Sequence, residues 1–435
     1  MKRVILVSLI VVLMAAETLG VKLSLAPGLS VKNAYLYVIL LILIIEAAMR
    51  KGEGQIELKN VHIPFIALLS YATLSWFVLS LLQVYPAYGM YEYLIALKSG
   101  LIDHYLVFLV FFYGVRSTRD ALWVVKYMLG IVVLSNIITL VDVYDIPDLG
   151  LIHERPDGRV SGPLGESNQY AAFLILFLPG IAVASWKALG LKRVVHFLGL
   201  LASLGVLVLT MSRGAIVGLT AGSVLGTFYL SHFLRPGQYV KTAIAVTALT
   251  AITLIAIGYQ YSDLLYARFI EQSSVASIET ASTGRSEIWS GMLSKQLEVP
   301  ITFIVGYGWD TYTMMRRMGE FVDAPHNVYL HYLFTLGIIG LALFLTVVIN
   351  IMRVTKKAIA MTDEFTRVQL MAFVFGFLSL LIAISFVDLY DPWPFVWAYT
   401  GLMMRVAIGA SAEQPSINTR SEIHDFSGTH SVLPR

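Results

Sequence analysis

Residues 327–350 read NVYLHYLFTLGIIGLALFLTVVIN, a stretch without a single Lys, Arg, Asp or Glu. A helix needs about 20 apolar residues to cross the hydrocarbon core of a bilayer, so this stretch predicts a membrane-spanning helix. Stretches of the same kind recur along the whole chain. They predict twelve spans, over residues 4–21, 34–49, 62–82, 94–115, 121–141, 168–186, 194–211, 214–231, 240–258, 327–350, 367–387 and 393–409.

The composition agrees with this pattern. Of the 435 residues, 57% are hydrophobic and 14% are charged, and the mean hydropathy is +0.74. A soluble domain carries roughly 25% charged residues, so this chain lacks the charge to cover a soluble surface. The fold class we predict is an all-α polytopic membrane protein. A net charge of +3 gives no reason to expect a nucleic-acid partner, and the absence of Cys excludes disulfides and thiol chemistry.

The distribution of Lys and Arg predicts that both termini lie in the cytoplasm. With the N-terminus inside, 20 of the 31 positive residues fall on the cytoplasmic side. Lys2 and Arg3 precede an apolar run that resembles a signal peptide, which we interpret as a retained first span. The predicted organisation is nine spans in residues 1–258, an outer loop over 259–326, three spans in 327–410 and a disordered cytoplasmic tail over 411–435.

The outer loop is the longest connection in the chain, and connections above roughly 15 residues are usually functional or disordered. Its many aromatic residues argue for a packed subdomain or an interfacial location. Charges inside the predicted spans are few: Glu17, Glu46 and Lys126, each expected near a span end. One regularity lies in the eighth span, where a glycine every fourth residue lets another helix approach closely and predicts a rigid, central helix: Gly214, Gly218, Gly222 and Gly226.

Three polar residues are expected at helix N-termini on the outer side. Arg213 begins the eighth span, Arg285 opens a predicted helix that runs to about Leu297, and His326 follows Pro325, which suits a first helical turn. Helix N-termini attract phosphate, and arginine adds donors and a permanent charge. Histidine takes a proton from an attacking hydroxyl near neutral pH. Each residue alone is also typical of an interfacial anchor or a cap, and spacing alone does not bring them together.

Other chemistries are not indicated. His326 and His331 are five residues apart, which does not match the i, i+4 pair of a zinc protease helix. The acidic pairs Asp142/Asp145 and Asp388/Asp391 have no neighbouring third ligand in the sequence. The sequence holds no phosphate-binding loop and no serine nucleophile elbow, and we expect a site without metal or cofactor.

Several short motifs, in this order, resemble the O-antigen ligase and polymerase superfamily. They are Arg159-Val160-Ser161-Gly162 ahead of Asn168, Ser212-Arg213-Gly214-Ala215, Gly284-Arg285-Ser286-Glu287-Ile288-Trp289, Val305-Gly306-Tyr307-Gly308, His326-Asn327-Val328-Tyr329-Leu330 and Leu336-Gly337-Ile338-Ile339-Gly340. The twelve predicted spans and the single long outer loop also match that family.

The resemblance implies an inverting, metal-independent glycosyltransferase of the bacterial inner membrane, with its active site facing the periplasm. The donor would be a glycan on undecaprenyl diphosphate. A ligase would transfer it to lipid A–core, and a polymerase to another repeat unit. By the same likeness His326 would activate the acceptor hydroxyl, and Arg213 and Arg285 would bind the diphosphate. Arg159 and Asp388 are second candidates.

The sequence favours a ligase and leaves the polymerase open, because acceptor choice depends on the shape of the outer loop. A polysaccharide exporter or flippase is a third interpretation. It would require polar residues along a path through the spans, and none is evident. A non-catalytic scaffold is a fourth, and it would not need His326 among those arginines.

Overall fold

The computed structural model describes residues 2–18, 24–26, 28–49, 58–82, 90–146, 158–233, 285–321, 323–390 and 392–413. The first half contains α1 (Lys2–Thr18), a hairpin of β1 (Ser24–Ala26) and β2 (Leu29–Ser30), α2 (Val31–Met49), α3 (Lys59–Leu82), α4 (Met90–Leu97), the π-helical turn η1 (Lys98–Ile102), α5 (Asp103–Tyr113) and α6 (Thr118–Val143). The second half contains the 3-10 turn η2 (Gly162–Leu164), α7 (Ser167–Lys187), α8 (Gly190–Leu209), α9 (Arg213–Leu230), the 3-10 turn η3 (Ser231–Phe233), α14 (Arg285–Glu298), α15 (Thr302–Val305), α16 (Thr311–Arg317), α17 (Val328–Met361), α18 (Glu364–Ala383) and α19 (Trp393–Glu413).

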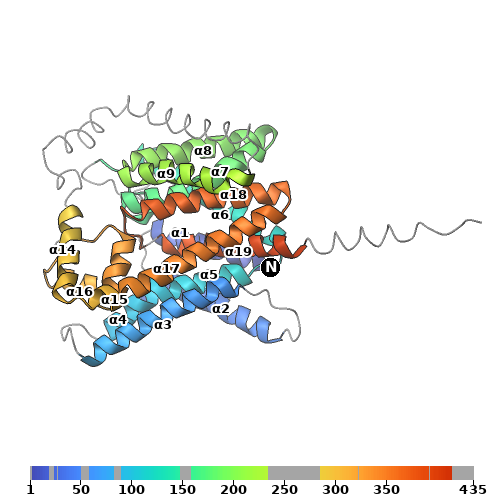
Figure 1. Cartoon of the computed structure of the whole chain (residues 1–435). Coiled ribbons are helices and arrows are strands. Elements are labelled where there is room, and N and C mark those ends of the chain that lie inside the picture. Colours follow the sequence, from blue (N-terminus) through green and yellow to red (C-terminus); the bar gives the residue numbers. More distant parts are fainter. Residues whose placement is uncertain are drawn as a thin grey trace, which may run out of the picture.

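The described chain is a bundle of long helices with the short helices α14, α15 and α16 gathered at one end (Figure 1). Eight of the described helices are long and apolar enough to cross a membrane. Eleven of the twelve predicted spans fall on described helices, and the segment 240–258 lies outside the described residues. The helix α17 is longer than its predicted span and continues to Met361, and α19 extends past the predicted boundary at residue 410 to Glu413.

The glycine face of α9 packs against α18, as the spacing predicted. A Cβ atom at Gly222 would lie 2.4 Å from the Ser379 Cα atom, and one at Gly218 would lie 2.7 Å from the Ser379 carbonyl oxygen. Only hydrogen fits at these positions, so the two backbones pack at short range. The prediction that this helix is central is wrong. In the most apolar stretch of α7, 72% of the residues are buried, against 39% in the corresponding stretch of α9.

The centre of the bundle is instead the contact of α7 with α18 and α19. A Cβ atom at Gly376 of α18 would lie 2.0 Å from the Leu176 carbonyl oxygen of α7, so these helices also approach closely. Aromatic rings fill the space beside this contact: Phe177 lies 5.0 Å from Tyr399 between ring centroids, and Phe373 lies 5.2 Å from Phe377. Large buried rings contribute most to such a core because they bury the greatest area.

Charges near the end of α1 and the starts of α2 and α5 are paired. Glu17 accepts from Lys32 at 2.5 Å. Asp103, which the sequence analysis did not single out, accepts from Lys98 at 2.7 Å and from the Tyr37 hydroxyl at 2.5 Å. Ionised side chains within a membrane are usually paired with one another. These contacts therefore explain the charges as structural ion pairs, without a role in transport.

A kink in α17 attaches the short helices to the bundle. Gly337 has φ 64° and ψ −169°, a conformation essentially restricted to glycine, and it interrupts the helical hydrogen bonds of the preceding turn. The freed carbonyl oxygens of Leu333, Phe334 and Thr335 accept from the Gln296 amide, the Tyr307 N–H and the Gly308 N–H at 3.0, 2.9 and 2.7 Å. The two motifs around Tyr307 and Gly337 therefore meet at this kink.

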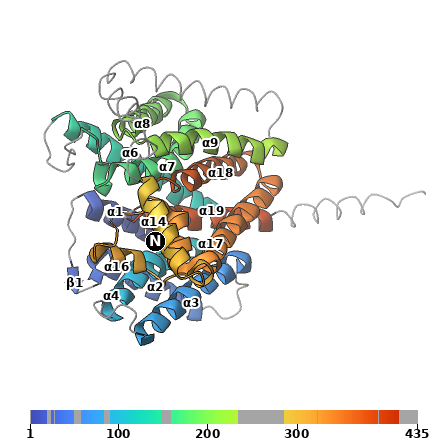
Figure 2. The same cartoon turned by 60° about the vertical axis from the view of Figure 1, so that its left-hand side comes forward.

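The short helices share a second hydrophobic cluster with the start of α17. Its buried members come from α14, α16 and α17: Met292, Tyr312, Met315 and Phe334. Figure 2 shows α14 crossing in front of the bundle, with α16 close to it. Phe334 is the member of the cluster that α17 contributes. The described part of the predicted outer loop is thus packed by its aromatic residues.

Candidate active site

Arg213 is the first residue of α9, as predicted. The turn before it is tight: Met211 adopts a left-handed φ of 49°, and the Ser212 hydroxyl caps the helix by accepting from the Ala215 N–H at 3.4 Å. The other N–H groups of the first turn of α9 have no partner within the helix, as at any helix N-terminus.

Arg159 binds the backbone of that turn. Its Nε atom donates to the Thr210 carbonyl oxygen at 2.9 Å, and its guanidinium also donates to the Asn168 side chain at 2.7 Å. The side chain of Arg159 is buried, with 3% of the residue exposed. These contacts tie the start of α7 to the turn that carries Arg213, which favours a positioning role for Arg159.

Arg285 is the first residue of α14, and this helix runs to Glu298, close to the predicted end. One turn along the same helix, the indole nitrogen of Trp289 donates to the Pro325 carbonyl oxygen at 2.7 Å. Residues four apart share one helix face, so Arg285 and Trp289 lie on the same side of α14. Trp289 therefore couples the helix of Arg285 to the segment that precedes His326.

His326 lies just before α17 in a left-handed conformation with φ 50°. Asn327 is the N-cap, and its side chain accepts from the Leu330 N–H at 3.0 Å. The expectation that Pro325 belongs to the first helical turn is wrong, because the helix begins at Val328. Left-handed backbone is uncommon for histidine and costs free energy, so the surrounding contacts must hold it.

Asp388, from the connection between α18 and α19, supplies the strongest of those contacts. Its two carboxylate oxygens accept from the backbone N–H groups of His326 and Asn327 at 2.7 and 3.2 Å. Burial raises the pKa of Asp388, while His326, these two N–H groups and the Arg285 guanidinium lower it. The carboxylate thus joins residues 326 and 327 to the charge of Arg285.

The imidazole of His326 lies between two carboxylates. Its Nδ1 atom is 4.0 Å from the buried Asp388, and its Nε2 atom is 3.6 Å from the exposed Asp323. The side chain of His326 is 28% exposed. One ring nitrogen therefore lies beside a buried carboxylate and the other beside an exposed one.

The structure brings His326, Asp388 and Arg285 to one place. Arg213 is placed beside the same connection, because a Cβ atom on the next residue, Gly214, would lie 2.8 Å from Phe386. Among the described residues, no group of three His, Asp or Glu side chains could hold a metal ion.

Sequence reasoning missed four residues around this site. Trp289, Tyr312 and Asp323 shape the segment before His326, and Gln169 accepts from the Tyr390 N–H at 2.9 Å next to Asp388. Two of them gave a local signal: Asp323 is an acidic residue three positions before His326, and Trp289 ends the motif at residues 284–289. Tyr312 and Gln169 contribute through contacts distant in sequence, which no spacing reveals.

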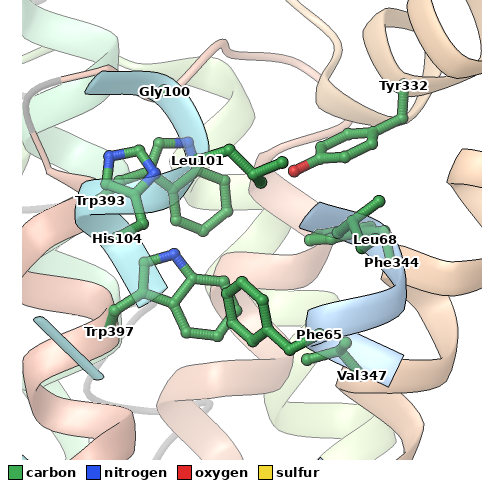
Figure 3. A pocket seen from close by; sticks show the side chains of 10 residues that line it. All are labelled: Phe65, Leu68, Gly100, Leu101, His104, Tyr332, Phe344, Val347, Trp393 and Trp397. Atoms are coloured by element: carbon green, nitrogen blue, oxygen red, sulfur yellow. The ribbon is translucent and has the colours of Figure 1, made fainter. Parts of the chain in front are cut away.

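An apolar pocket lies within the bundle, close to the start of α17 (Figure 3). Tyr332, one turn into α17, and Trp393, the first residue of α19, line its outer part, and Trp397 and Phe65 line it deeper in the bundle. The other lining residues are Leu68, Gly100, Leu101, His104, Phe344 and Val347. Most of these side chains are aromatic or aliphatic, and the cavity they leave is about 10 Å³, the size of one water molecule.

Comparison with known proteins shows similarity over the middle of the chain. Residues 198–345 match the family model described as O-Antigen ligase, and this range contains Arg213, Arg285 and His326. A curated protein named O-antigen ligase, from Pseudomonas aeruginosa, is 30% identical over 192 residues.

Over these residues the chain is similar to O-antigen ligases. The alignment with the Pseudomonas aeruginosa ligase covers 44% of this chain and 41% of that protein. Asp388 and Arg159 lie outside the range of the O-antigen ligase model, so their part in the site rests on the structure.

Proposed function

We propose that this protein is an O-antigen ligase that transfers a polysaccharide from undecaprenyl diphosphate to lipid A–core. The observation that carries the proposal is the placement of His326 between Asp388 and Asp323, coupled through Trp289 to the helix that begins with Arg285. A base, an orienting carboxylate and a permanent cation at a helix N-terminus are the groups that displacement of a diphosphate requires.

In the proposed reaction, the acceptor hydroxyl oxygen attacks the anomeric carbon of the donor sugar. The bond from that carbon to the diphosphate oxygen breaks, and the configuration inverts. Nε2 of His326 takes the hydroxyl proton, and Asp388 beside Nδ1 stabilises the imidazolium that forms. Arg285 and Arg213 stabilise the charge that develops on the leaving diphosphate.

The proposal of a lipid-linked donor rests on the similarity to O-antigen ligases and on the apolar helices that adjoin the site. The proposed location is the bacterial inner membrane with the site on the periplasmic face, as the distribution of Lys and Arg predicts.

The test is transfer by the purified protein with undecaprenyl-diphosphate glycan as donor. Lipid A–core and a second repeat unit are offered separately as acceptors. We expect His326→Ala to lower the rate with lipid A–core by roughly a hundredfold or more, the contribution of a general base, while His196→Ala, on α8, retains the native rate. Transfer by His326→Ala at the native rate would refute the site.

Product identity decides the acceptor. Transfer to the second repeat unit in place of lipid A–core would establish a polymerase with the same donor chemistry, and no product with either acceptor would favour transport. We expect EDTA to leave the rate unchanged. Inhibition by EDTA that a divalent metal reverses would contradict the proposed metal-independent mechanism.

A further inference from the structure

A row of exposed polar side chains continues outward from His326. The Asp323 carboxylate lies 3.6 Å from Nε2 of His326 and 3.9 Å from a guanidinium nitrogen of Arg316 on α16. The side chain of Asp323 is 63% exposed, and that of Arg316 is 41% exposed. The proposed transfer step uses neither residue.

The two carboxylate oxygens of Asp323 have different surroundings. Oδ1 accepts from the Ala324 N–H at 2.7 Å, which fixes the side chain against its own turn. Oδ2 is the atom beside Nε2 of His326, at a separation longer than a direct hydrogen bond. An acceptor oxygen is therefore held next to the nitrogen that would take the proton.

The backbone under Asp323 is also fixed. Its carbonyl oxygen accepts from the Tyr312 hydroxyl, and Tyr312 is buried in the cluster that joins α14, α16 and α17. Two residues later, Trp289 holds the Pro325 carbonyl oxygen. Asp323 and His326 consequently keep a set separation, which a ligand that contacts both would require.

We propose that Asp323 and Arg316 form the subsite for the acceptor sugar, with Asp323 Oδ2 accepting a hydrogen bond from the hydroxyl next to the attacking one. The inference rests on the proposed function and names a sugar with two adjacent free hydroxyls as the acceptor class. One hydroxyl donates to Nε2 of His326 and its neighbour donates to Asp323. The Arg316 guanidinium, which only donates, binds a further sugar oxygen. Hydroxyl groups serve both partners because each donates and accepts.

The first measurement separates the acceptor KM from the donor KM. We expect Asp323→Ala to raise the KM for lipid A–core by about tenfold or more, the effect of losing a hydrogen bond to a charged group, and to leave the KM for the donor unchanged. Glu320→Ala and Arg317→Ala are matched controls on the same surface and should retain both values. An unchanged acceptor KM, or an equal rise in the donor KM, would overturn the assignment.

The second measurement uses synthetic acceptors that lack single hydroxyls on the terminal sugar. With the native enzyme, an acceptor that lacks the hydroxyl next to the attacking one should have its KM raised as much as Asp323→Ala raises it. In the Asp323→Ala variant, removing the same hydroxyl should raise the KM no further. A merely structural role for Asp323 would make the two losses independent, which would refute the inference. Asp323→Asn keeps the Oδ1 contact to Ala324, so it repeats the test if the alanine variant does not fold.

These outcomes are distinct from failure of the proposed function. If His326→Ala transfers glycan at the native rate, the catalytic site itself is wrong. If His326→Ala is inactive while Asp323→Ala has a native acceptor KM, the site stands and only the acceptor subsite is wrong.

Discussion

At the scale of single residues, the site depends on a histidine in a backbone conformation that it rarely adopts. Contacts from three elements hold the segment around His326: Trp289 of α14, Tyr312 of α16 and the Asp388 carboxylate. Strain of this kind persists only where the surroundings over-determine it. In the proposed reaction, these contacts would fix the backbone of the base before a substrate arrives, which would lower the cost of reaching the reactive geometry.

Asp388 leads to a prediction for stability against pH. Because burial raises its pKa, the folded protein keeps this proton at pH values where the unfolded chain has lost it. Its contribution to stability is complete below the ordinary aspartate pKa of about 4 and is lost as the pH rises through the raised value. Asp388→Asn removes this titration. We expect the difference in Tm, native protein minus variant, to decrease as the pH rises from 4 to 7. Thermal unfolding in detergent measures both Tm values.

The control for this measurement is Leu297→Ala, an exposed position on α14 that carries no titratable group. Its difference from the native protein should not depend on pH over the same range. If the Tm difference for Asp388→Asn were independent of pH, the pKa of Asp388 would be the same in the folded and the unfolded protein.

Arg213 leads to a prediction about its planar guanidinium group. Arg213→Lys keeps one positive charge but removes the planar guanidinium that contacts a phosphate at two points, so we expect the transfer rate to fall roughly tenfold. Arg317→Lys, at an exposed position on α16, should retain the native rate. Native donor KM and kcat in Arg213→Lys would show that this residue does not bind the diphosphate.

At the scale of elements, the kink in α17 joins the membrane bundle to the helices that shape the site. It exposes three carbonyl oxygens, and α14 and the Gly306–Gly308 segment satisfy them. Unpaired buried carbonyl groups are costly, so the kink and these partners stabilise each other.

The kink predicts that Gly337→Ala disrupts the site from a distance. The new Cβ atom would lie 2.2 Å from the Ile304 carbonyl oxygen and 2.6 Å from the Gly306 nitrogen, and the backbone conformation excludes alanine. We expect lower Tm, faster proteolysis within residues 298–321 and loss of most transfer activity. Gly205→Ala, on α8 with nothing within 4 Å, is the matched control. Native proteolysis in Gly337→Ala would mean that the kink does not hold these helices.

At the scale of the whole molecule, α18 is central to the packing. It contacts α7 through Gly376 and receives the glycine face of α9 around Ser379. The connection after α18 then carries Asp388 to His326. The position of the site therefore depends on how closely these helices pack.

This packing predicts a loss of stability for Gly222→Ala. The added methyl group would lie 2.4 Å from the Ser379 Cα atom, and overpacking of this kind costs about 1–3 kcal/mol. We expect a lower Tm together with reduced transfer, because α9 carries Arg213. Gly130→Ala, in α6 with open space around it, should be neutral or slightly stabilising. Equal Tm values for the two variants would argue against close packing of α9 and α18.

The sequence by itself determined the class of fold and most of its helices. Long apolar segments have one outcome in a bilayer, because only a helix satisfies every backbone group within its own segment. Local rules also placed Arg213 and Arg285 at helix N-termini and the glycines of α9 on one face. These features depend on residues within a few positions of each other, so spacing reveals them.

Only the tertiary structure decided which residues meet. Asp388 lies 62 residues from His326 along the chain, and Trp289 lies 36 residues from Pro325. The kink at Gly337, the centrality of α7 and the place of Asp323 beside Nε2 likewise follow from packing between distant segments. Such contacts depend on how side-chain volumes and freed hydrogen-bonding groups fit together in space, and no local pattern records that fit.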